Sequence, residues 1–183
     1  INKLEEKFYN ISHIDIPVNL GYGYGVKTAL SKISGDIAGF MWGDDQFDAR
    51  IVASMVDVFL KNPEIKMVKT FRVKRYDGNY RLLISKIYQL IFRILFGYYT
   101  RDINSGPKIF RYDLLKNLLP LDSNDWFLDA EIMIKFSKII KKGELVEIPI
   151  EFFPRKFGKS NVKFTACLQF IINLIKYKFF KPQ

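Results

Sequence analysis

The sequence contains one cysteine, Cys167, and one histidine, His13, among its 183 residues. A single cysteine excludes a disulfide framework within the chain and a metal cluster held by several cysteines. A single histidine excludes catalysis by paired histidines and a zinc site built from several of them. Cys167 lies in an apolar run, where we expect a small core side chain.

Long uncharged apolar segments, internal repeats and Pro/Gly-rich linkers are also absent, and the length fits one domain. Residues 82–99 are strongly apolar but contain Lys86 and Arg93, and residues 165–175 form a short apolar run before Lys176. Neither segment reaches the roughly 20 apolar residues that a membrane span needs. We expect two amphipathic helices at a membrane interface; two buried core helices are the alternative.

The positive charge is concentrated in two segments, although the net charge is +10 overall. Residues 69–111 hold ten basic and two acidic residues, and residues 155–183 hold seven basic residues and no acidic one. Both segments are also apolar and aromatic, which favours an anionic membrane surface over nucleic acid as the partner. They contain no recognised nucleic-acid-binding motif, so we expect no nucleic-acid partner.

Apolar strand-like segments alternate with helical ones, which predicts an α/β fold. The helical pattern predicts helices at residues 26–33, 49–60, 82–99, 130–140 and 165–180. Strands are predicted at residues 14–18, 37–42, 67–73, 108–110 and 145–152. Pro149 places the last strand at a sheet edge, and Asp48 is expected to cap the helix that follows it.

Two adjacent carboxylates and an amide end the second predicted strand, in the stretch FMWGDDQF (residues 40–47). Ligands collect beyond the carboxyl ends of strands in open α/β sheets. In an extended chain, Asp44 and Gln46 would share one side and offer oxygen ligands to Mg²⁺ or Mn²⁺ bound with a diphosphate. The alternative is an ordinary polar turn before the next helix.

Further polar segments accompany this turn. Glycine amides in Asn19–Gly23 precede a helix and offer a phosphate-binding backbone. Residues 102–106 form a polar loop between apolar segments. Asp129 and Glu131 precede a helix, with one of them expected to face a cleft, and residues 155–160 form a basic loop suited to an anion.

These motifs, taken in order, resemble a family 2 glycosyltransferase with a GT-A type fold. The likeness is to polyprenyl-phosphate sugar transferases of the dolichol-phosphate mannose synthase type. It rests on six segments: NLGYGYGVKTAL, SGDIAGFMWGDDQFD, SKIYQLIFRILFG, DINSGPKIF, FLDAEIMIKF and VEIPIEFFPRKFGKSNV.

The resemblance implies a nucleotide-sugar donor, a polyprenyl-phosphate acceptor and inverting transfer, with Mg²⁺ or Mn²⁺ held by Asp44 and Gln46. Trp42 stands where the family has the first carboxylate of its metal motif, and Asp45 is an additional acid. Pro107-Lys108 and Asn161 are further departures, since the family more often has Phe-Arg and Lys there. The candidate donor-binding residues are Asn19, Gly21, Gly23, Asp45, Ser105 and Gly106.

An anionic acceptor needs no strong base, and the candidate residues for binding its phosphate are Arg155 and Ser160, with Arg72 or Arg75 as looser candidates. A saccharide hydroxyl acceptor would instead need Asp129 or Glu131 as a base. The predicted catalytic residues are therefore Asp44, Asp129, Glu131 and Arg155.

The family begins with two strands that hold the nucleotide, and no residues before Ile14 match them. Residues 1–12 are expected to form the helix before the third family strand, and the start at Ile1 suggests a missing N-terminal part. We expect a transferase domain at residues 1–163 and an interface helix at residues 164–183, at the cytoplasmic face of the membrane. The alternatives are a saccharide acceptor in cell-surface polysaccharide synthesis and a non-catalytic fragment.

Overall fold

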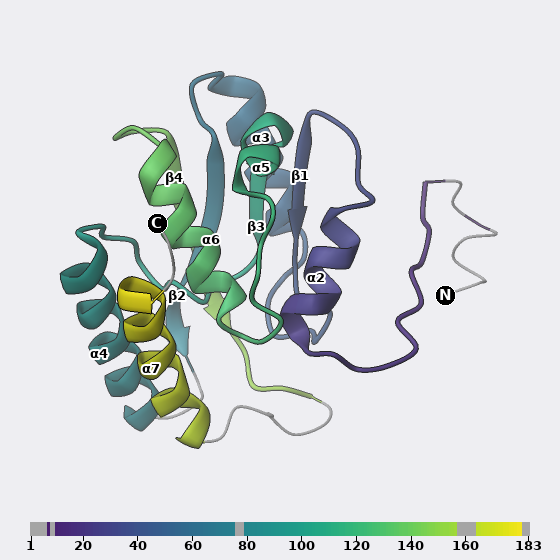
Figure 1. Cartoon of the computed structure of the whole chain (residues 1–183). Coiled ribbons are helices and arrows are strands. Elements are labelled where there is room, and N and C mark those ends of the chain that lie inside the picture. The colour runs from purple at the N-terminus through teal and green to yellow at the C-terminus, as the bar shows by residue number, and fades with distance from the viewer. Residues whose placement is uncertain (1–6, 8–9, 76–78, 157–163, 181–183) are drawn as a thin grey trace.

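A four-stranded mixed sheet forms the centre of the computed structural model, which describes residues 7, 10–75, 79–156 and 164–180. Its order is β1-β3-β2-β4, with β3 antiparallel to β1 and β2, and β4 parallel to β2 (Figure 1). The strands are β1 (Ile37–Phe40), β2 (Met67–Arg75), β3 (Lys108–Arg111) and β4 (Leu145–Phe152). The α/β prediction is confirmed, and β4 lies at an edge as its proline predicted.

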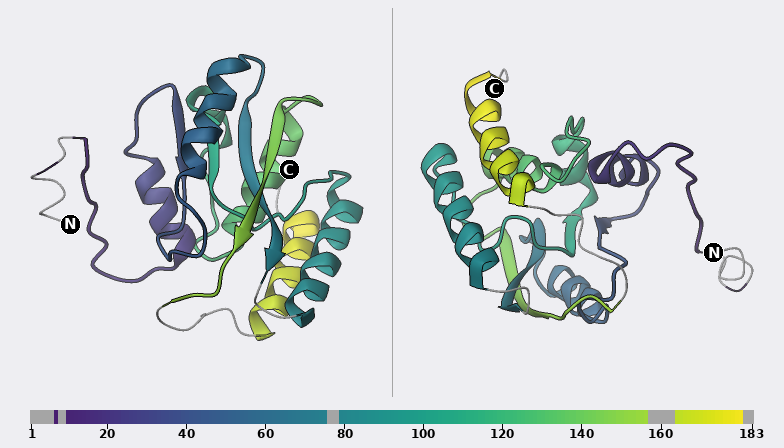
Figure 2. Two further views of the ribbon diagram at one scale, coloured as in Figure 1. Left: turned by 180° about the vertical axis from the view of Figure 1, so that it is seen from behind. Right: turned by 90° about the horizontal axis from the view of Figure 1, so that it is seen from below.

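Helices cover both faces of this sheet. They are α2 (Tyr22–Leu30), α3 (Ile51–Lys61), α4 (Asn79–Phe96), α5 (Tyr112–Leu118), α6 (Leu128–Ile139) and α7 (Phe164–Phe180). Helix α3 covers one face, and α6 lies on the other with α2 and α5 beside it (Figure 2). Helices α4 and α7 pack against each other through Tyr88 and Phe170, whose ring centroids are 5.9 Å apart.

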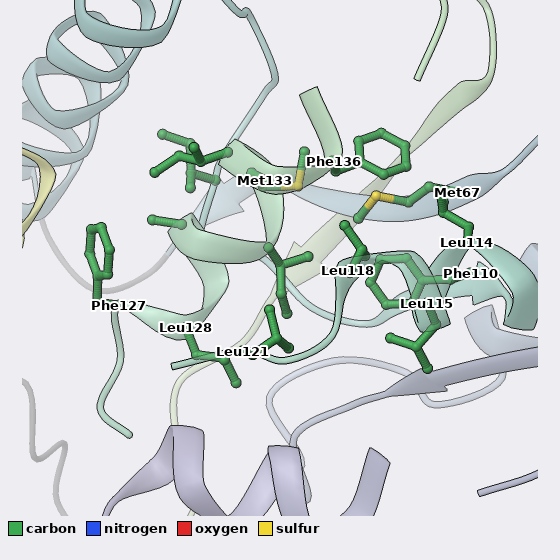
Figure 3. Packing of buried hydrophobic residues seen from close by; sticks show 14 of the residues in the cluster. Met67, Phe110, Leu114, Leu115, Leu118, Leu121, Phe127, Leu128, Met133 and Phe136 are labelled. Atoms are coloured by element: carbon green, nitrogen blue, oxygen red, sulfur yellow. The ribbon is translucent and has the colours of Figure 1, made fainter. Parts of the chain in front are cut away.

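Alternation along the strands builds a core on each face. Met67 and Phe110 are fully buried on the α6 side, where Figure 3 shows them among leucines of α5 and side chains of α6. Their neighbours Val68 and Ile109 pack on the other face with residues of α3. Because successive strand residues point to opposite faces, this two-sided burial follows from the apolar runs in the sequence.

Two buried lysines lie side by side on neighbouring strands, because Lys69 of β2 is the register partner of Lys108 of β3. The Lys108 ammonium donates to Asp129 of α6. The Lys69 ammonium donates to the Arg101 carbonyl and lies 3.1 Å from the Glu147 carboxylate. Burial lowers the Lys69 pKa to about 8, against an opposing effect of Glu147 and with a further lowering by Lys108.

The first turn of α2 lies directly on the loop that precedes α6. The Tyr24 amide donates to the Asn124 carbonyl at 3.1 Å. A Cβ added at Gly21 would lie 2.4 Å from the Asn124 oxygen, and one at Gly23 would lie 2.5 Å from the Ser123 oxygen. Only residues without a side chain permit this approach of two backbone segments.

One predicted strand is wrong, one helix was not predicted, and two predictions fall outside the described residues. Residues 14–18 form no strand; they are almost all exposed and pair with no strand of the described sheet, and Pro17 lacks an amide hydrogen. Helix α5 was not predicted, because its seven residues are too few for a clear helical pattern. The helix expected at residues 1–12 lies mostly outside the described residues, as does Ser160.

Replacing Lys69 by methionine tests the buried lysine. Its pKa is about 8 in the folded protein, lowered from the ordinary value of 10.5. Between these values the unfolded chain binds more protons, so stability should rise with pH in the wild type relative to Lys69→Met. We expect a gain on the order of 1–3 kcal/mol between about pH 8 and 10.5. Urea unfolding of both proteins across this range measures it, and a pH-independent difference would contradict the assignment.

Substitutions of two glycines in α2 test the contact with the loop before α6. Gly23→Ala should lower the free energy of unfolding by about 1–3 kcal/mol, because its Cβ meets backbone atoms that cannot move alone. Gly25→Ala is the matched control: its Cβ would meet only the Ile16 side chain, at 3.7 Å. This control should be stabilised by about 0.4–1 kcal/mol, and equal effects of the two changes would refute the packing role.

Candidate functional site

A turn at residues 43–48, here called the acid turn, follows β1 and carries the predicted metal ligands. The strand ends at Phe40, and Asp45 adopts a positive φ of 56°, so the turn is not the extended chain assumed from the sequence. Asp44 and Gln46 nevertheless converge, because both bind the guanidinium of Arg155. The Arg155 Nη2 lies 2.8 Å from Asp44 Oδ2, and its Nε lies 3.3 Å from Gln46 Oε1.

Main-chain and side-chain contacts fix the orientation of the Gln46 amide. Its Nε2 donates to the Phe153 carbonyl at 2.9 Å, and the Phe153 amide donates to the Gln46 carbonyl at 2.7 Å. The side-chain oxygen of Gln46 is therefore left on the side of Asp44. The Asp44 and Gln46 side-chain oxygens thus lie around the same point, just beyond the end of β4, where the Arg155 guanidinium binds both.

The donor atoms at this position fit a divalent ion that also binds a diphosphate. Asp44 Oδ1 is buried and has no hydrogen-bond partner, which is costly unless a ligand satisfies it. Mg²⁺ typically takes one or two carboxylates and completes its shell with phosphate and water. No group of three or more His, Cys, Asp or Glu within the described ranges suits a metal, so a substrate phosphate would have to supply the missing ligands.

Trp42 replaces the expected first carboxylate with an aromatic packing residue. Its indole Nε1 donates to the Tyr22 hydroxyl at 3.2 Å, and its ring meets Phe47 and Phe152 edge-on. A Cβ at Gly106 would lie 3.5 Å from this ring, so the ring covers that glycine. Asp45 does not take over the missing role in this structure, because its exposed carboxylate pairs with Lys156.

The glycine segment before α2 gives no open phosphate cradle. Gly21 and Gly23 contact the loop before α6, as described above. The Asn19 side-chain oxygen accepts a hydrogen bond from the Gly21 amide at 3.0 Å. This structure therefore gives the three residues a packing and turn-forming role. Their assignment to the donor stays a prediction without support from the geometry.

The loop at residues 102–106 is likewise used within the fold. The Ser105 hydroxyl is fully buried and 3.0 Å from the Thr70 hydroxyl. Asp102 forms a two-pronged ion pair with Arg72, with both N–O distances at 2.6 Å. Arg72 is thus committed to a structural carboxylate, which weakens the prediction that it binds the acceptor phosphate; Arg75 has no described side chain.

Neither predicted base faces a cleft. Asp129 is 2% exposed and paired with the buried Lys108. Glu131 is fully buried, and its carboxylate accepts hydrogen bonds from the amides of Asp122 and Ser123 at 2.9 and 2.8 Å. These two bonds fix the loop before α6. The expectation from alternate spacing is therefore wrong for both carboxylates.

The aromatic and cationic residues around these acids were not predicted from the sequence. The Tyr22 hydroxyl accepts from the Trp42 indole, and its ring stacks on Trp126 with centroids 4.5 Å apart. Burial, reinforced by the Asp129 charge, raises the pKa of the Tyr22 hydroxyl, which keeps it a hydrogen-bond donor. The one signal in the sequence was Lys108, a lysine at the start of a short strand whose next two residues are apolar.

Comparisons with known proteins place these features in a family. The chain is similar to crystal structures of glucosyl-3-phosphoglycerate synthase from Mycobacterium tuberculosis. For the complex with phosphoglyceric acid, the identity is 18% and the TM-score 0.70, over 92% of this chain and 58% of that one. For the complex with Mn²⁺, UDP-glucose and glycerol 3-phosphate, the values are 19% and 0.69 over the same shares. The complex with Mg²⁺ and UDP gives 19% and 0.69, again over those shares.

These structures confirm the GT-A type fold, although this chain spans only 58% of their length. No curated protein matches the sequence. The family model described as glycosyl transferase family 2 matches residues 1–119, which is more than half of the chain. The chain therefore belongs to glycosyl transferase family 2.

Proposed function

We propose that this chain belongs to an inverting glycosyltransferase that moves a sugar from a nucleotide-sugar to a polyprenyl phosphate at the cytoplasmic face of a membrane. UDP-glucose is the first donor to test, because similar structures bind it with Mn²⁺. The same structures bind phosphorylated small molecules, which supports a phosphate-bearing acceptor.

The proposal rests mainly on one observation: both candidate bases, Asp129 and Glu131, are buried and already paired with other groups of the protein. A hydroxyl nucleophile needs a base to take its proton, whereas a phosphate monoester is already an anion near neutral pH. Asp129 is neutralised by Lys108, and Glu131 is enclosed by the loop that it holds. This geometry supports a phosphate acceptor over a saccharide hydroxyl.

The acid turn supplies the donor side of the proposed chemistry. Asp44 and Gln46 would hold Mg²⁺ or Mn²⁺, which when bound neutralises charge on the leaving diphosphate. Arg155 supplies a forked donor that suits a phosphate, two hydrogen bonds at a time. The neighbouring Lys156 adds a second positive charge at the same edge.

Exposed apolar stripes on α4 and α7 support a membrane surface as partner. Leu83, Ile87, Leu90 and Ile94 recur at helical spacing on α4, and Leu168, Ile172, Ile175 and Phe179 repeat the same spacing on α7. All eight are more than 40% exposed, while other residues of these helices form their mutual contact. Lysines and arginines beside such stripes favour anionic headgroups. Within the described helices, none is long and apolar enough to cross a membrane.

A transfer assay tests the proposed acceptor. We expect the protein to transfer sugar from UDP-glucose to undecaprenyl phosphate, with Mn²⁺ required, and with at least a hundredfold loss of rate in Asp44→Ala, on the order of a removed electrostatic contact. Asp129→Asn should keep kcat within about tenfold after correction for folded protein, because that carboxylate moves no proton. Transfer to 3-phosphoglycerate alone, or to a saccharide hydroxyl, would reject the lipid acceptor.

A vesicle-binding experiment tests the membrane partner. Ile94→Glu should reduce binding to phosphatidylglycerol-containing vesicles about fivefold to tenfold, because it removes an apolar contact and adds a like charge. Leu60→Glu on α3 is the control, since Leu60 and Ile94 are both 72% exposed. Cosedimentation measures both variants, and equal losses would show that the α4 stripe has no special role.

A further inference from the structure

Residues 153–156, here called the β4 extension, are fastened to the acid turn by both backbone and side chains. Phe153 exchanges hydrogen bonds with Gln46, and Lys156 pairs with Asp45. The Arg155 guanidinium binds Asp44 and Gln46 together. The two residues that fit a metal are therefore bound to an internal cation in this structure.

We propose that Arg155 is an internal competitor of the divalent metal for Asp44 and Gln46, so that metal entry releases Arg155 to bind the acceptor phosphate. This inference rests on the proposed function for the metal site, and adds an order of events to it. The donor complex must bind first, because only then is the forked guanidinium available to an incoming phosphate.

Electrostatics favours exchange over joint occupancy. A guanidinium and a divalent ion on the same two oxygens would repel each other at short range. The Arg155 and Asp44 side chains are 34% and 22% exposed, so their pair is held more firmly than a surface pair but still opens to solvent. Asp44 Oδ1 is buried and has no hydrogen-bond partner, so it is an acceptor that a bound metal would satisfy and that Arg155 does not.

The backbone contacts allow the exchange without moving the β4 extension. Phe153 and Gln46 are joined by a short backbone hydrogen bond that does not involve Arg155. A change in the Arg155 side chain alone can therefore release Asp44, while the extension keeps the guanidinium near the site. By thermodynamic linkage, metal binding and acceptor binding then strengthen each other through this one side chain.

Mn²⁺ binding tests the competition without measuring catalysis. Titrations followed by the paramagnetic resonance signal of free Mn²⁺ would use the protein alone and with UDP. Arg155→Met should bind Mn²⁺ alone about threefold to tenfold more tightly than wild type, the strength of a partly buried ion pair. Arg155→Lys, which keeps the charge but loses the fork, should give a smaller increase.

Lys156→Met is the matched control, because it removes the same charge from the same segment but leaves Asp44 and Gln46 paired. It should change the Mn²⁺ affinity less than twofold on the same scale. Equal tightening in both variants, or weaker binding in Arg155→Met, would overturn the competition while leaving the metal site intact. No Mn²⁺ binding in any variant, even with UDP, would contradict the metal site and the competition together.

Farnesyl phosphate, a short polyprenyl phosphate, tests the release of Arg155. Without metal, wild type and Arg155→Met should bind it with affinities within about twofold, because the guanidinium is engaged with Asp44. With Mn²⁺ and UDP, wild type should bind it about tenfold more tightly than Arg155→Met, the value of a charge-assisted contact. An Arg155 contribution that is the same with and without Mn²⁺–UDP would overturn the proposed order.

Discussion

The buried ion pair between Lys108 and Asp129 joins the central strand β3 to α6, and the arrangement of the site depends on it. The Asp129 charge also acts on Tyr22, where it helps burial to raise the hydroxyl pKa, and Tyr22 accepts the indole hydrogen of Trp42. Asp129 thus connects α6 to the sheet, and Tyr22 connects α2 to Trp42, the residue before the acid turn. Removing one partner of such a pair typically costs 3–5 kcal/mol, because the other charge stays buried. Because Asp129 is paired with Lys108, it is also not available to take a proton from an acceptor.

In the acid turn, only Asp44 offers a carboxylate to the candidate metal position, and two cations of the β4 extension pair with the turn's acids. Trp42 fills the place of one acid with ring packing over Gly106, and Asp45 turns towards Lys156. Asp44 and Gln46 alone present oxygens to a shared position, where Arg155 now lies. In the proposed chemistry, the diphosphate of the donor would add negative charge to that of Asp44. A phosphate acceptor fits this balance, because it too brings charge that arginine can match.

Much of this fold was predictable, because strands that are buried on both faces consist of consecutive apolar residues. Strands β1, β2, β3 and β4 and five of the six described helices were predicted, although α2 begins at Tyr22 and not at residue 26. The site was less predictable, because hydrogen bonds across the fold leave no local pattern. The glycines before α2 signalled close approach, but the approaching group was the Asn124 loop. Likewise, the spacing of Asp129 and Glu131 gave no hint of Lys108, which lies far away in sequence.

A crystal structure with Mn²⁺ and UDP tests the central claim most directly, because anomalous scattering locates the manganese without reference to activity. The account predicts a manganese peak bound to both Asp44 and Gln46 oxygens, with the Arg155 guanidinium moved off Asp44 and Asp129 still paired with Lys108. A manganese ion bound elsewhere, or an Arg155–Asp44 pair that persists beside the bound ion, would contradict it.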